Sequence, residues 1–554
     1  MISRIARLRP SSSRLPLSLT STSIRSASTS SAPHLGNKSL RIGIVGGGPA
    51  GFYAAGRLLG LAGSEQVKVD LFELLPTPFG LARFGVAPDH PEVKNCEHKF
   101  EETARDPRFR YFGNVQVCGT SPSTASSSSS STVVPNLSPS SLAVQIPLSS
   151  LQSHYDAVLL TYGASLDRPL GIPGEFSLSN VLSARSFVNW YNGHPYHSSL
   201  LAPLLDLSKI EHVSIIGQGN VALDVARILL KPVEELKEFD VPEYAMEELS
   251  RSGVKRVEVV GRRGVLQLAA TTKELREMMN LEGVGFDGIE EETMREAEAI
   301  VGKMGSEGRA KKRALGLLQK GSLKTKAGQG EKSWSLEFLK SPKELLPYDT
   351  ASSPSRTTSS TTFFDSLMDP PQRVGSILYD LNELVPPSNG NGSDPSQFVA
   401  RPTGETKRVE TDMVFKSVGY RSIGIPGLPF DERKGIVRNV DGRVTNESGE
   451  TMKGLYTSGW LARGPNGVIA TTMFNAFATA DLIASDLASS TTTTSTEAGE
   501  GDIDSMIESY RGDKKFVNWE EWERIDRVEK ERGKAKGKLR EKITSVEEML
   551  KVIE

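Results

Sequence analysis

Two glycine-rich loops, each set between a β-branched run and a helical pattern, constrain this chain more than any other feature. The first loop covers residues 46–51, follows the run 42–45, and has the form G-x-G-x-x-G. The second covers 217–222 and follows the run 213–216. Glycines in this context let the backbone approach a pyrophosphate at the N-terminus of the next helix. We therefore predict an α/β fold with two Rossmann-like dinucleotide-binding units.

The residues after each loop differ in charge and indicate a different cofactor for each unit. Glu73 ends the strand-like run 67–72, about twenty residues after the first loop, where a carboxylate would bind a ribose diol. Arg262 and Arg263 follow the run 256–260 after the second loop, and paired guanidinium groups match an extra ribose phosphate. We expect FAD at the first loop, NADP at the second, and hydride transfer between them. The alternative for either loop is a glycine-rich turn without a ligand.

The first 38 residues have the composition of a mitochondrial transit peptide. They contain six basic residues, many serines and no acid, and the first acidic residue of the chain is Glu65. The alternative is a disordered tail without a targeting role. Loss of the six positive charges would change the formal net charge from −2 to about −8, so we do not expect nucleic acid as a partner. No apolar run reaches the length of a membrane-spanning helix.

Cysteine usage limits the redox groups that this chain can carry. Cys96 and Cys118 are the two cysteines in the sequence, and no C-x-x-C pair occurs. A dithiol redox centre is therefore not expected, nor is an iron–sulfur cluster, which usually needs four thiolates. We expect no metal site, and electrons that enter the flavin should leave from the flavin.

Several longer runs resemble the family of mitochondrial NADPH:adrenodoxin (ferredoxin) reductases. They are PFGLARFGVAPDHPEVKN at 78–95, GQGNVALDVAR at 217–227, VGRRG at 260–264, KELREM at 273–278, SGW at 458–460 and RGPNGVIATTM at 463–473. The resemblance extends from about residue 40 to the C-terminus and lapses in polar inserts such as the serine-rich 121–141. Asn466 departs from the family, which has threonine there.

The resemblance implies a glutathione-reductase-like arrangement of two Rossmann-like domains. We predict a disordered transit peptide at 1–38, a first part of the FAD-binding domain at 39–167, an NADP-binding domain at 168–421, and a second part of the FAD-binding domain at 422–554. The charged segment 520–554, with spaced apolar residues, should form a helical tail on the surface.

The resemblance also implies a set of cofactor contacts. For FAD these are Gly46, Gly48, Ala50, Gly51, Glu73, Leu81 and Val117, with Trp460, Gly467, Val468 and Ile469 beside the isoalloxazine. For NADP they are Gln218, Gly219, Asn220, Val221, Arg262, Arg263, Glu274 and Gly467.

Two further residues are candidates for proton transfer. The resemblance places His90 and Asp224 near the flavin, which indicates a proton relay, and histidine titrates in the useful pH range. The alternative for His90 is a turn residue or a hydrogen-bonded core group. Trp460 has a similar alternative as an ordinary core aromatic.

The function implied is electron transfer from NADPH through FAD to an acidic [2Fe–2S] ferredoxin in the mitochondrial matrix, with peripheral attachment to the inner membrane left open. Arg276 matches a family contact with ferredoxin, and Arg309 and Arg313 lie in a basic cluster that would steer an acidic partner. A solvated charge run is the alternative for the cluster. Two other functions are weighed: an amidotransferase-type flavin subunit, which normally carries cysteine clusters, and a non-catalytic NADP-binding scaffold.

Overall fold

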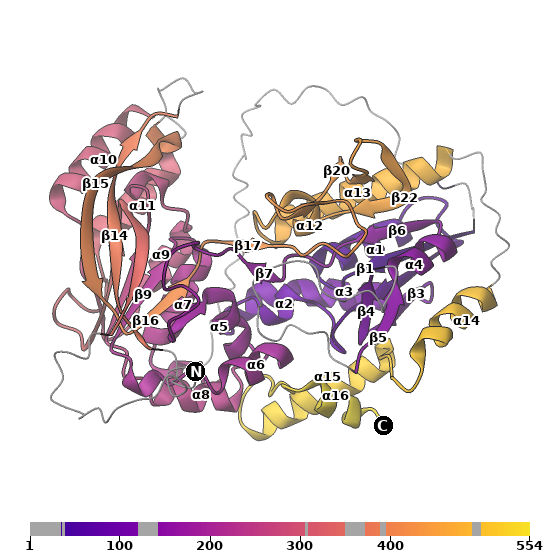
Figure 1. Ribbon diagram of the computed structural model, residues 1–554. Coiled ribbons are helices and arrows are strands. Elements are labelled where there is room, and N and C mark those ends of the chain that lie inside the picture. The colour runs from indigo at the N-terminus through magenta and orange to yellow at the C-terminus, as the bar shows by residue number, and fades with distance from the viewer. Residues whose placement is uncertain are drawn as a thin grey trace, which may run out of the picture.

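The computed structural model of the protein describes residues 35, 39–119, 142–304, 308–348, 372–387, 395–489 and 500–554. Nearly all of the predicted transit peptide and the serine-rich insert 121–141 lie outside these residues, as do most of the other polar inserts. Within the described part, the chain forms two sheet-centred units that Figure 1 shows side by side, with helices α15 (Trp519–Ala535) and α16 (Val546–Val552) along their lower edge.

The first unit, here called the seven-stranded unit, is built on a sheet whose central strands are parallel. β1 is buried along almost its whole length and pairs in parallel with β2 on one side and β6 on the other. β-Branched and leucine residues fill these strands because both faces of such a sheet are covered. In spatial order the strands are β20 (Asn439–Val440), β21 (Arg443–Thr445), β22 (Thr451–Thr457), β6 (Ala157–Leu160), β1 (Leu40–Val45), β2 (Val67–Phe72) and β3 (Phe109–Phe112).

Helices from both ends of the chain cover this sheet. α1 packs against α13, although more than 400 residues separate their starts, because the return segment adds β22 beside β6. The helices of the unit are α1 (Pro49–Leu59), α2 (Leu81–Phe84), α3 (Cys96–Ala104), α4 (Leu148–His154), α12 (Trp460–Arg463) and α13 (Ile469–Ser489). A small parallel pair, β4 (Val115–Cys118) with β5 (Val144–Pro147), lies beside the main sheet.

The second unit, here called the six-stranded unit, has a sheet in which every neighbouring pair is parallel. Its order is β11 (Val284–Phe286), β12 (Lys332–Glu337), β10 (Arg256–Val260), β9 (His212–Ile216), β16 (Met413–Lys416) and β8 (Val181–Ser183). The surrounding helices are α5 (Ala184–Tyr191), α6 (Pro195–Leu201), α7 (Asn220–Leu230), α8 (Glu243–Ser250), α9 (Thr272–Met279), α10 (Glu291–Lys303) and α11 (Gly308–Lys320). The predicted α/β fold with two Rossmann-like units is confirmed.

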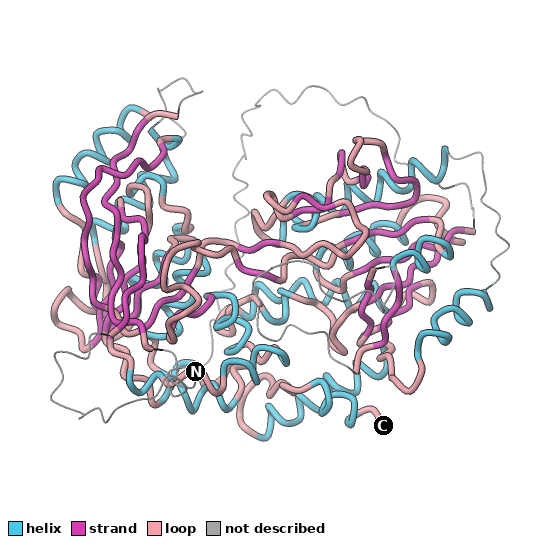
Figure 2. Tube along the Cα trace, in the orientation of Figure 1, coloured by secondary structure: helices cyan, strands magenta, loops and turns pink. Residues whose placement is uncertain are grey.

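A three-stranded antiparallel sheet extends the six-stranded unit, and Figure 2 shows its long strands at the outer side of the molecule. Its strands are β13 (Lys340–Pro347), β14 (Val374–Val385) and β15 (Val399–Glu410). The chain crosses between the two units at β7 (Leu166–Asp167) and β17 (Tyr420–Arg421), which pair antiparallel at the centre of Figure 1. These crossings lie beside the domain boundaries expected at 167/168 and 421/422, which stay a prediction.

The C-terminal tail 520–554 is helical and packs against the seven-stranded unit. α15 and α16 are helical, with α14 (Glu500–Arg511) before them, but α15 buries one face. Trp522, Ile525, Glu529 and Gly533 lie on that face at spacings of three or four residues. Ile525 packs into the same core cluster as strands β1 and β2. The tail therefore adds to the core of the seven-stranded unit through one face of α15, while the opposite face stays exposed.

Candidate functional site

The first glycine-rich loop forms an open cradle at the N-terminus of α1. Gly46 has φ 113°, and a Cβ there would lie 2.6 Å from the backbone of Thr161. A Cβ at Gly51 would lie 2.2 Å from the Gly46 carbonyl oxygen, so neither position accepts a side chain. At Gly48 a Cβ would meet no atom of the described residues within 4 Å. No side chain of the described chain caps α1, so its N-terminal amides remain available to an anion.

Glu73 lies at the edge of this cradle, directly after β2. Its Oε2 accepts a hydrogen bond of 2.6 Å from the Gly47 amide, and its Oε1 accepts one of 3.1 Å from Leu75. Burial raises the pKa of Glu73, and these backbone bonds oppose the rise. The carboxylate is thus fixed beside the loop, where the ribose of an adenosine would lie.

Distant segments close around the same cradle. The Phe79 amide donates to the Gly47 carbonyl at 2.7 Å, and a Cβ at Gly80 would lie 3.2 Å from the Gly48 Cα. This contact brings the 78–85 segment, which contains Leu81, against the loop. On the other side, a Cβ at Gly459 would lie 2.8 Å from Ala50, so the turn before α12 also contacts the start of α1.

Trp460 begins α12 immediately after that turn. Its ring centroid lies 5.8 Å from that of Tyr420, in strand β17 between the two units. Gly467 has φ 85° and precedes α13, Ile469 is the first residue of that helix, and the Val468 side chain is 57% exposed. Val117 lies in β4 and packs at the edge of a core cluster. The structure thus brings Ala50 and Trp460 into one neighbourhood.

The second loop forms an equivalent cradle at the N-terminus of α7. Gly217 has φ 120°, and a Cβ there would lie 2.1 Å from the Ser417 carbonyl oxygen. A Cβ at Gly219 would meet nothing within 4 Å among the residues described, and α7 has no side-chain cap from them. The free amides and the unobstructed approach fit a second pyrophosphate. In both units, therefore, the backbone itself has the shape that a dinucleotide requires.

The other residues expected at the NADP site have different local roles. The Gln218 amide group donates to the carbonyls of Val259 and Glu337, at 3.0 and 2.9 Å, and so ties the loop to the ends of β10 and β12. Asn220 accepts from the Thr271 amide at 2.9 Å, and the Thr271 hydroxyl donates to Glu274. Val221 packs partly buried against the core of the unit. The start of α9 is therefore fastened to the cradle.

Arg262 and Arg263 follow β10, whose C-terminal end lies beside that of β9 because the two strands are parallel. Both side chains are exposed, and neither forms an ion pair with a carboxylate in the described part of the chain. Gly261, just before them, lies directly against Gln218. Two uncommitted guanidinium groups therefore lie beside the second cradle, whereas the first cradle has a carboxylate.

His90 and Asp224 belong to a polar network between the two units that sequence reasoning did not anticipate. His90 Nε2 lies 2.8 Å from Glu277 Oε2, which links the segment after α2 to α9. Arg227, buried on α7, binds Asp89 with two hydrogen bonds of 3.0 Å, lies 2.8 Å from Asp224, and lies 3.5 Å from Glu277. One signal was present: Arg227 follows Asp224 by three residues on a helix, which is the spacing of an ion pair, within a run that carries the resemblance.

Neighbouring positive charges and burial shift the pKa values of the carboxylates in this network in opposite directions. Burial would raise the pKa of Asp89, but Arg227 and then Lys231 outweigh it and lower the pKa to about 2. Burial raises the pKa of Asp224, and the charges of Arg227 and His90 oppose it without reversing it. Asp224 is thus more easily protonated than an exposed aspartate, as a proton-relay residue requires.

The basic residues expected to bind a partner lie on neighbouring helices of the six-stranded unit. Arg276 is exposed on α9, and Arg309 and Arg313 are exposed on α11, which packs against α9. Lys311, in the same cluster, instead donates to the Leu266 carbonyl at 3.0 Å. Arg276, Arg309 and Arg313 therefore face solvent on adjoining helices.

Neither a cluster of metal-binding side chains nor a membrane-spanning helix occurs among the described residues. No group of three or more histidine, cysteine or acidic side chains is placed to hold a metal ion there. None of the helices in that part is long and apolar enough to cross a membrane.

Comparison with known proteins gives one consistent answer. No protein-family model matches the chain. Mitochondrial NADPH:adrenodoxin oxidoreductases of Salvelinus fontinalis and Drosophila melanogaster are each 41% identical, over 92% of this chain and 91% and 93% of their own lengths. The human protein of that name is 37% identical over 93% of this chain and 92% of its own.

A solved structure agrees with these relatives. Mycobacterium tuberculosis FprA in complex with NADPH is 33% identical, with a TM-score of 0.72, over 93% of this chain and all of that one. The two cradles, the opposite charges beside them and these relatives lead to the same assignment: this chain belongs to the mitochondrial NADPH:adrenodoxin oxidoreductase family.

Proposed function

We propose that this protein transfers electrons from NADPH through FAD to an acidic [2Fe–2S] ferredoxin of the mitochondrial matrix. The observation that carries the proposal is the pairing of two open cradles with ribose-end groups of opposite charge, Glu73 at one and Arg262 with Arg263 at the other. It is a FAD-dependent, NADP-binding oxidoreductase of mitochondria, as its family membership states.

The chain's own residues bind and orient the two cofactors. The amides at the start of α1 and Glu73 would hold the pyrophosphate and ribose of FAD, and Gly48 would admit them. The amides of α7 and the two arginines would hold NADP. When bound, the cofactors supply hydride transfer from nicotinamide to isoalloxazine and one-electron release to the partner. Trp460 and the 467–469 segment would border the isoalloxazine.

The network at the meeting of the two units would handle protons. His90 is held by Glu277 at 2.8 Å, and Asp224 lies within the same network through Arg227. His90 would exchange a proton with the flavin side, and Asp224 would serve as the second group. This assignment is supported by the raised pKa of Asp224 and by the position of the network between the units.

The partner would dock on the exposed cations of α9 and α11. An acidic protein surface is complementary to Arg276, Arg309 and Arg313, and such complementarity accelerates encounter at low salt.

Peripheral association with the inner membrane is part of the proposal, and co-sedimentation of the purified protein with cardiolipin vesicles tests it.

One experiment tests the main proposal. The purified protein is titrated with NADPH without oxygen, and a mitochondrial ferredoxin and cytochrome c are then added. A yellow protein that bleaches with about one equivalent of NADPH, and reduces cytochrome c in a ferredoxin-dependent manner, supports it. A colourless protein that binds NADP would instead indicate a scaffold.

A further inference from the structure

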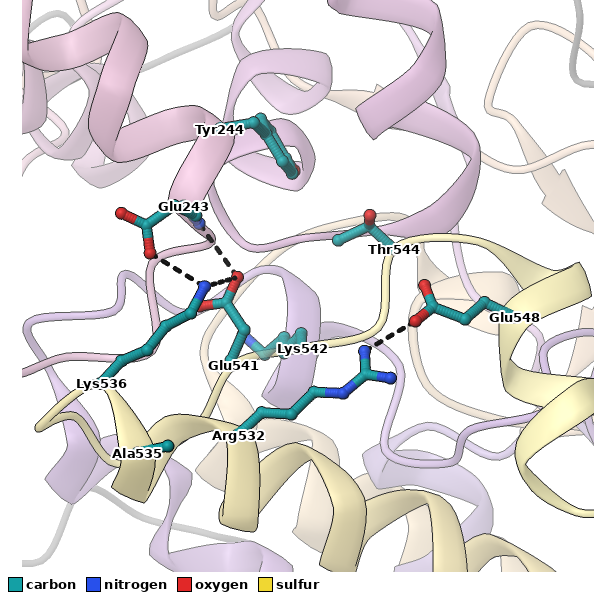
Figure 3. Close-up of a pocket in the computed structure, with 9 residues that line it drawn as sticks. All are labelled: Glu243, Tyr244, Arg532, Ala535, Lys536, Glu541, Lys542, Thr544 and Glu548. Atoms are coloured by element: carbon teal, nitrogen blue, oxygen red, sulfur yellow. Dashed lines mark hydrogen bonds and ion pairs between the residues drawn. The ribbon is translucent and has the colours of Figure 1, made fainter.

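The C-terminal tail contacts both units, and its charged residues meet at the place where the units meet. Residues 519–554 form α15, the loop 536–545 and α16. Figure 3 shows this loop and α15 facing the start of α8 in the six-stranded unit. The tail is therefore positioned to influence how the two units are held relative to each other.

On the side of the seven-stranded unit, the tail is anchored by a buried ion pair. Arg83 of α2 donates two hydrogen bonds to the Glu529 carboxylate, at 2.6 and 2.7 Å, and both side chains are at most 3% exposed. Glu529 also accepts from Arg540 at 2.8 Å and from the Ile543 amide at 3.0 Å. One carboxylate thus connects α2, α15 and the loop that follows α15.

On the side of the six-stranded unit, the same loop is bound to the segment that leads into α8. Lys538 donates to the Val241 carbonyl at 2.7 Å, and Lys536 pairs with Glu243 at 3.0 Å. The Glu243 amide donates to Glu541 at 3.1 Å, a contact that Figure 3 also shows. Backbone and side-chain bonds together fix the loop to this unit.

An ion-pair bridge of three residues joins the two units and the tail. Asp240 of the six-stranded unit lies 2.7 Å from Lys542 of the tail and accepts two bonds of 2.9 Å from Lys94 of the seven-stranded unit. Lys542 is 1% exposed and Asp240 is 10% exposed. Burial would raise the pKa of Asp240, but the two lysines hold it well below its usual range. Removal of either lysine would leave a buried charge less well compensated.

The bridge is also close to the site. Lys94 follows His90 by four residues in one short segment, so the bridge and the His90–Glu277 contact fix the same piece of chain to the six-stranded unit. Apart from such contacts, two short strands, β7 and β17, carry the chain between the units. Units joined in this way move relative to each other unless an interface restrains them.

We propose that residues 519–554 act as a strap between the two units, with Lys542, Asp240 and Lys94 as positioning residues that set the separation of the two cofactor sites. This inference rests on the proposed function, since hydride transfer needs reacting atoms about 3–3.5 Å apart. Loosening the strap should therefore slow hydride transfer without weakening the binding of either cofactor. A residue that only supported the fold would change stability and cofactor content together.

The test uses the full-length holoprotein with Lys542→Met, which keeps a long unbranched side chain and removes the ammonium group. Lys530→Met is the matched control, because Lys530 is 55% exposed and pairs with Asp526 within α15. Flavin reduction by NADPH is followed by stopped flow, which separates the limiting rate from the NADPH dissociation constant. We expect Lys542→Met to lower the limiting rate between about tenfold and a hundredfold, with an unchanged dissociation constant and FAD content. The control should match the parent.

A second readout does not depend on turnover. Spin labels at Glu298→Cys on α10 and Glu447→Cys near β21, with Cys96 and Cys118 replaced by serine, report the distance between the units. We expect Lys542→Met to broaden the distance distribution and Lys542→Arg, which keeps a cation, to narrow it again and to recover most of the rate. If Lys542→Met does not fold, Lys94→Met takes its place, with the same expectations.

The outcomes separate the strap from the proposed function. A Lys542→Met protein with the parental rate and distance distribution would overturn the strap, as would a slower rate with an unchanged distribution. A parent protein whose flavin is not reduced by NADPH would overturn the proposed function. In that case the spin-label distances still decide whether the tail holds the two units together.

Discussion

The preference for NADPH over NADH should depend on Arg262 and Arg263. Both side chains are exposed at the end of β10, beside the loop that begins at Gly217, and neither is committed to a carboxylate among the described residues. Replacement of both by alanine should therefore remove contacts to the 2′-phosphate of NADPH and little else. NADH lacks that phosphate, so its use should change little.

The expected loss of kcat/KM follows from the type of hydrogen bond that is removed and from its exposure to solvent. A hydrogen bond between charged groups contributes about 1.5–3 kcal/mol. Because both guanidinium groups are open to solvent, the lower end applies, which is about tenfold for each arginine. The double variant should lose about a hundredfold in kcat/KM for NADPH, mostly through KM. Its thermal midpoint should stay near that of the parent, because no ion pair within the described fold is lost.

The assay is steady-state reduction of ferricyanide with each coenzyme. Ferricyanide is a small acceptor, so the result does not depend on docking of a ferredoxin. Arg256→Ala is the matched control: Arg256 starts the same strand, is exposed, and pairs with Glu258 at 2.8 Å, at the opposite end from the cradle. The control should keep the parental ratio of NADPH to NADH activity. Equal losses with both coenzymes in the double variant would refute the assignment of the arginines to the phosphate.

Three further predictions concern the cradles, the partner surface and the network. A Cβ at Gly48 or Gly219 meets no described atom, so both valine variants should fold. Gly48→Val should lack FAD, whereas Gly219→Val should keep FAD but lose its reduction by NADPH. Flavin absorbance distinguishes the two variants, and the opposite pattern would show that the two cofactor sites are swapped. Arg309→Glu with Arg313→Glu should slow ferredoxin reduction, reduce its salt dependence and spare ferricyanide reduction; parental ferredoxin activity at low salt would place docking elsewhere. Asp89→Asn should lower the free energy of unfolding at pH 7 by about 2 kcal/mol, from a pKa lowered to about 2. Because the pKa is lower in the folded state, this stabilisation is complete above the unfolded pKa and is lost as the pH falls through the folded pKa of about 2. The difference should therefore narrow in urea titrations below about pH 4, and a constant difference down to pH 3 would contradict it.

The parts of the site that depend on local sequence were predictable. The positive φ angles of Gly46 and Gly217 and the tight approach at Gly51 explain why a short glycine pattern identifies each cradle. The charged residues after the next strand, Glu73 and Arg262, were predictable in the same way, because parallel pairing brings the ends of β1 and β2, or of β9 and β10, together. Family resemblance added Trp460, whose neighbour Gly459 contacts Ala50 across the fold, and the 467–469 segment, whose place beside the isoalloxazine stays a prediction.

The contacts between distant segments were not predictable in the same way. Arg83 and Glu529 are 446 residues apart in sequence, and Glu529 lies among charges that are typical of a solvated helix. Its spacing from Trp522 and Ile525 places it on the buried face, but a pattern of apolar residues predicts burial of apolar groups and not of a carboxylate. The pairing with Arg83 becomes visible only when the tail is seen against α2.

The buried charged pairs at the interface between the two units bear on how the units are placed relative to each other. A buried ion pair often stabilises a protein no more than apolar residues of similar size would, whereas loss of one partner is strongly unfavourable. Such pairs are geometrically demanding, so they favour one relative placement of the segments that they join. Here one residue from each of two sets flanks His90 in sequence: Arg83, which pairs with Glu529, and Lys94, which with Lys542 pairs with Asp240. An enzyme that must bring two separately bound rings together gains from that restriction, and this is why the tail's charges are expected to affect the rate of hydride transfer more than the affinity for either cofactor.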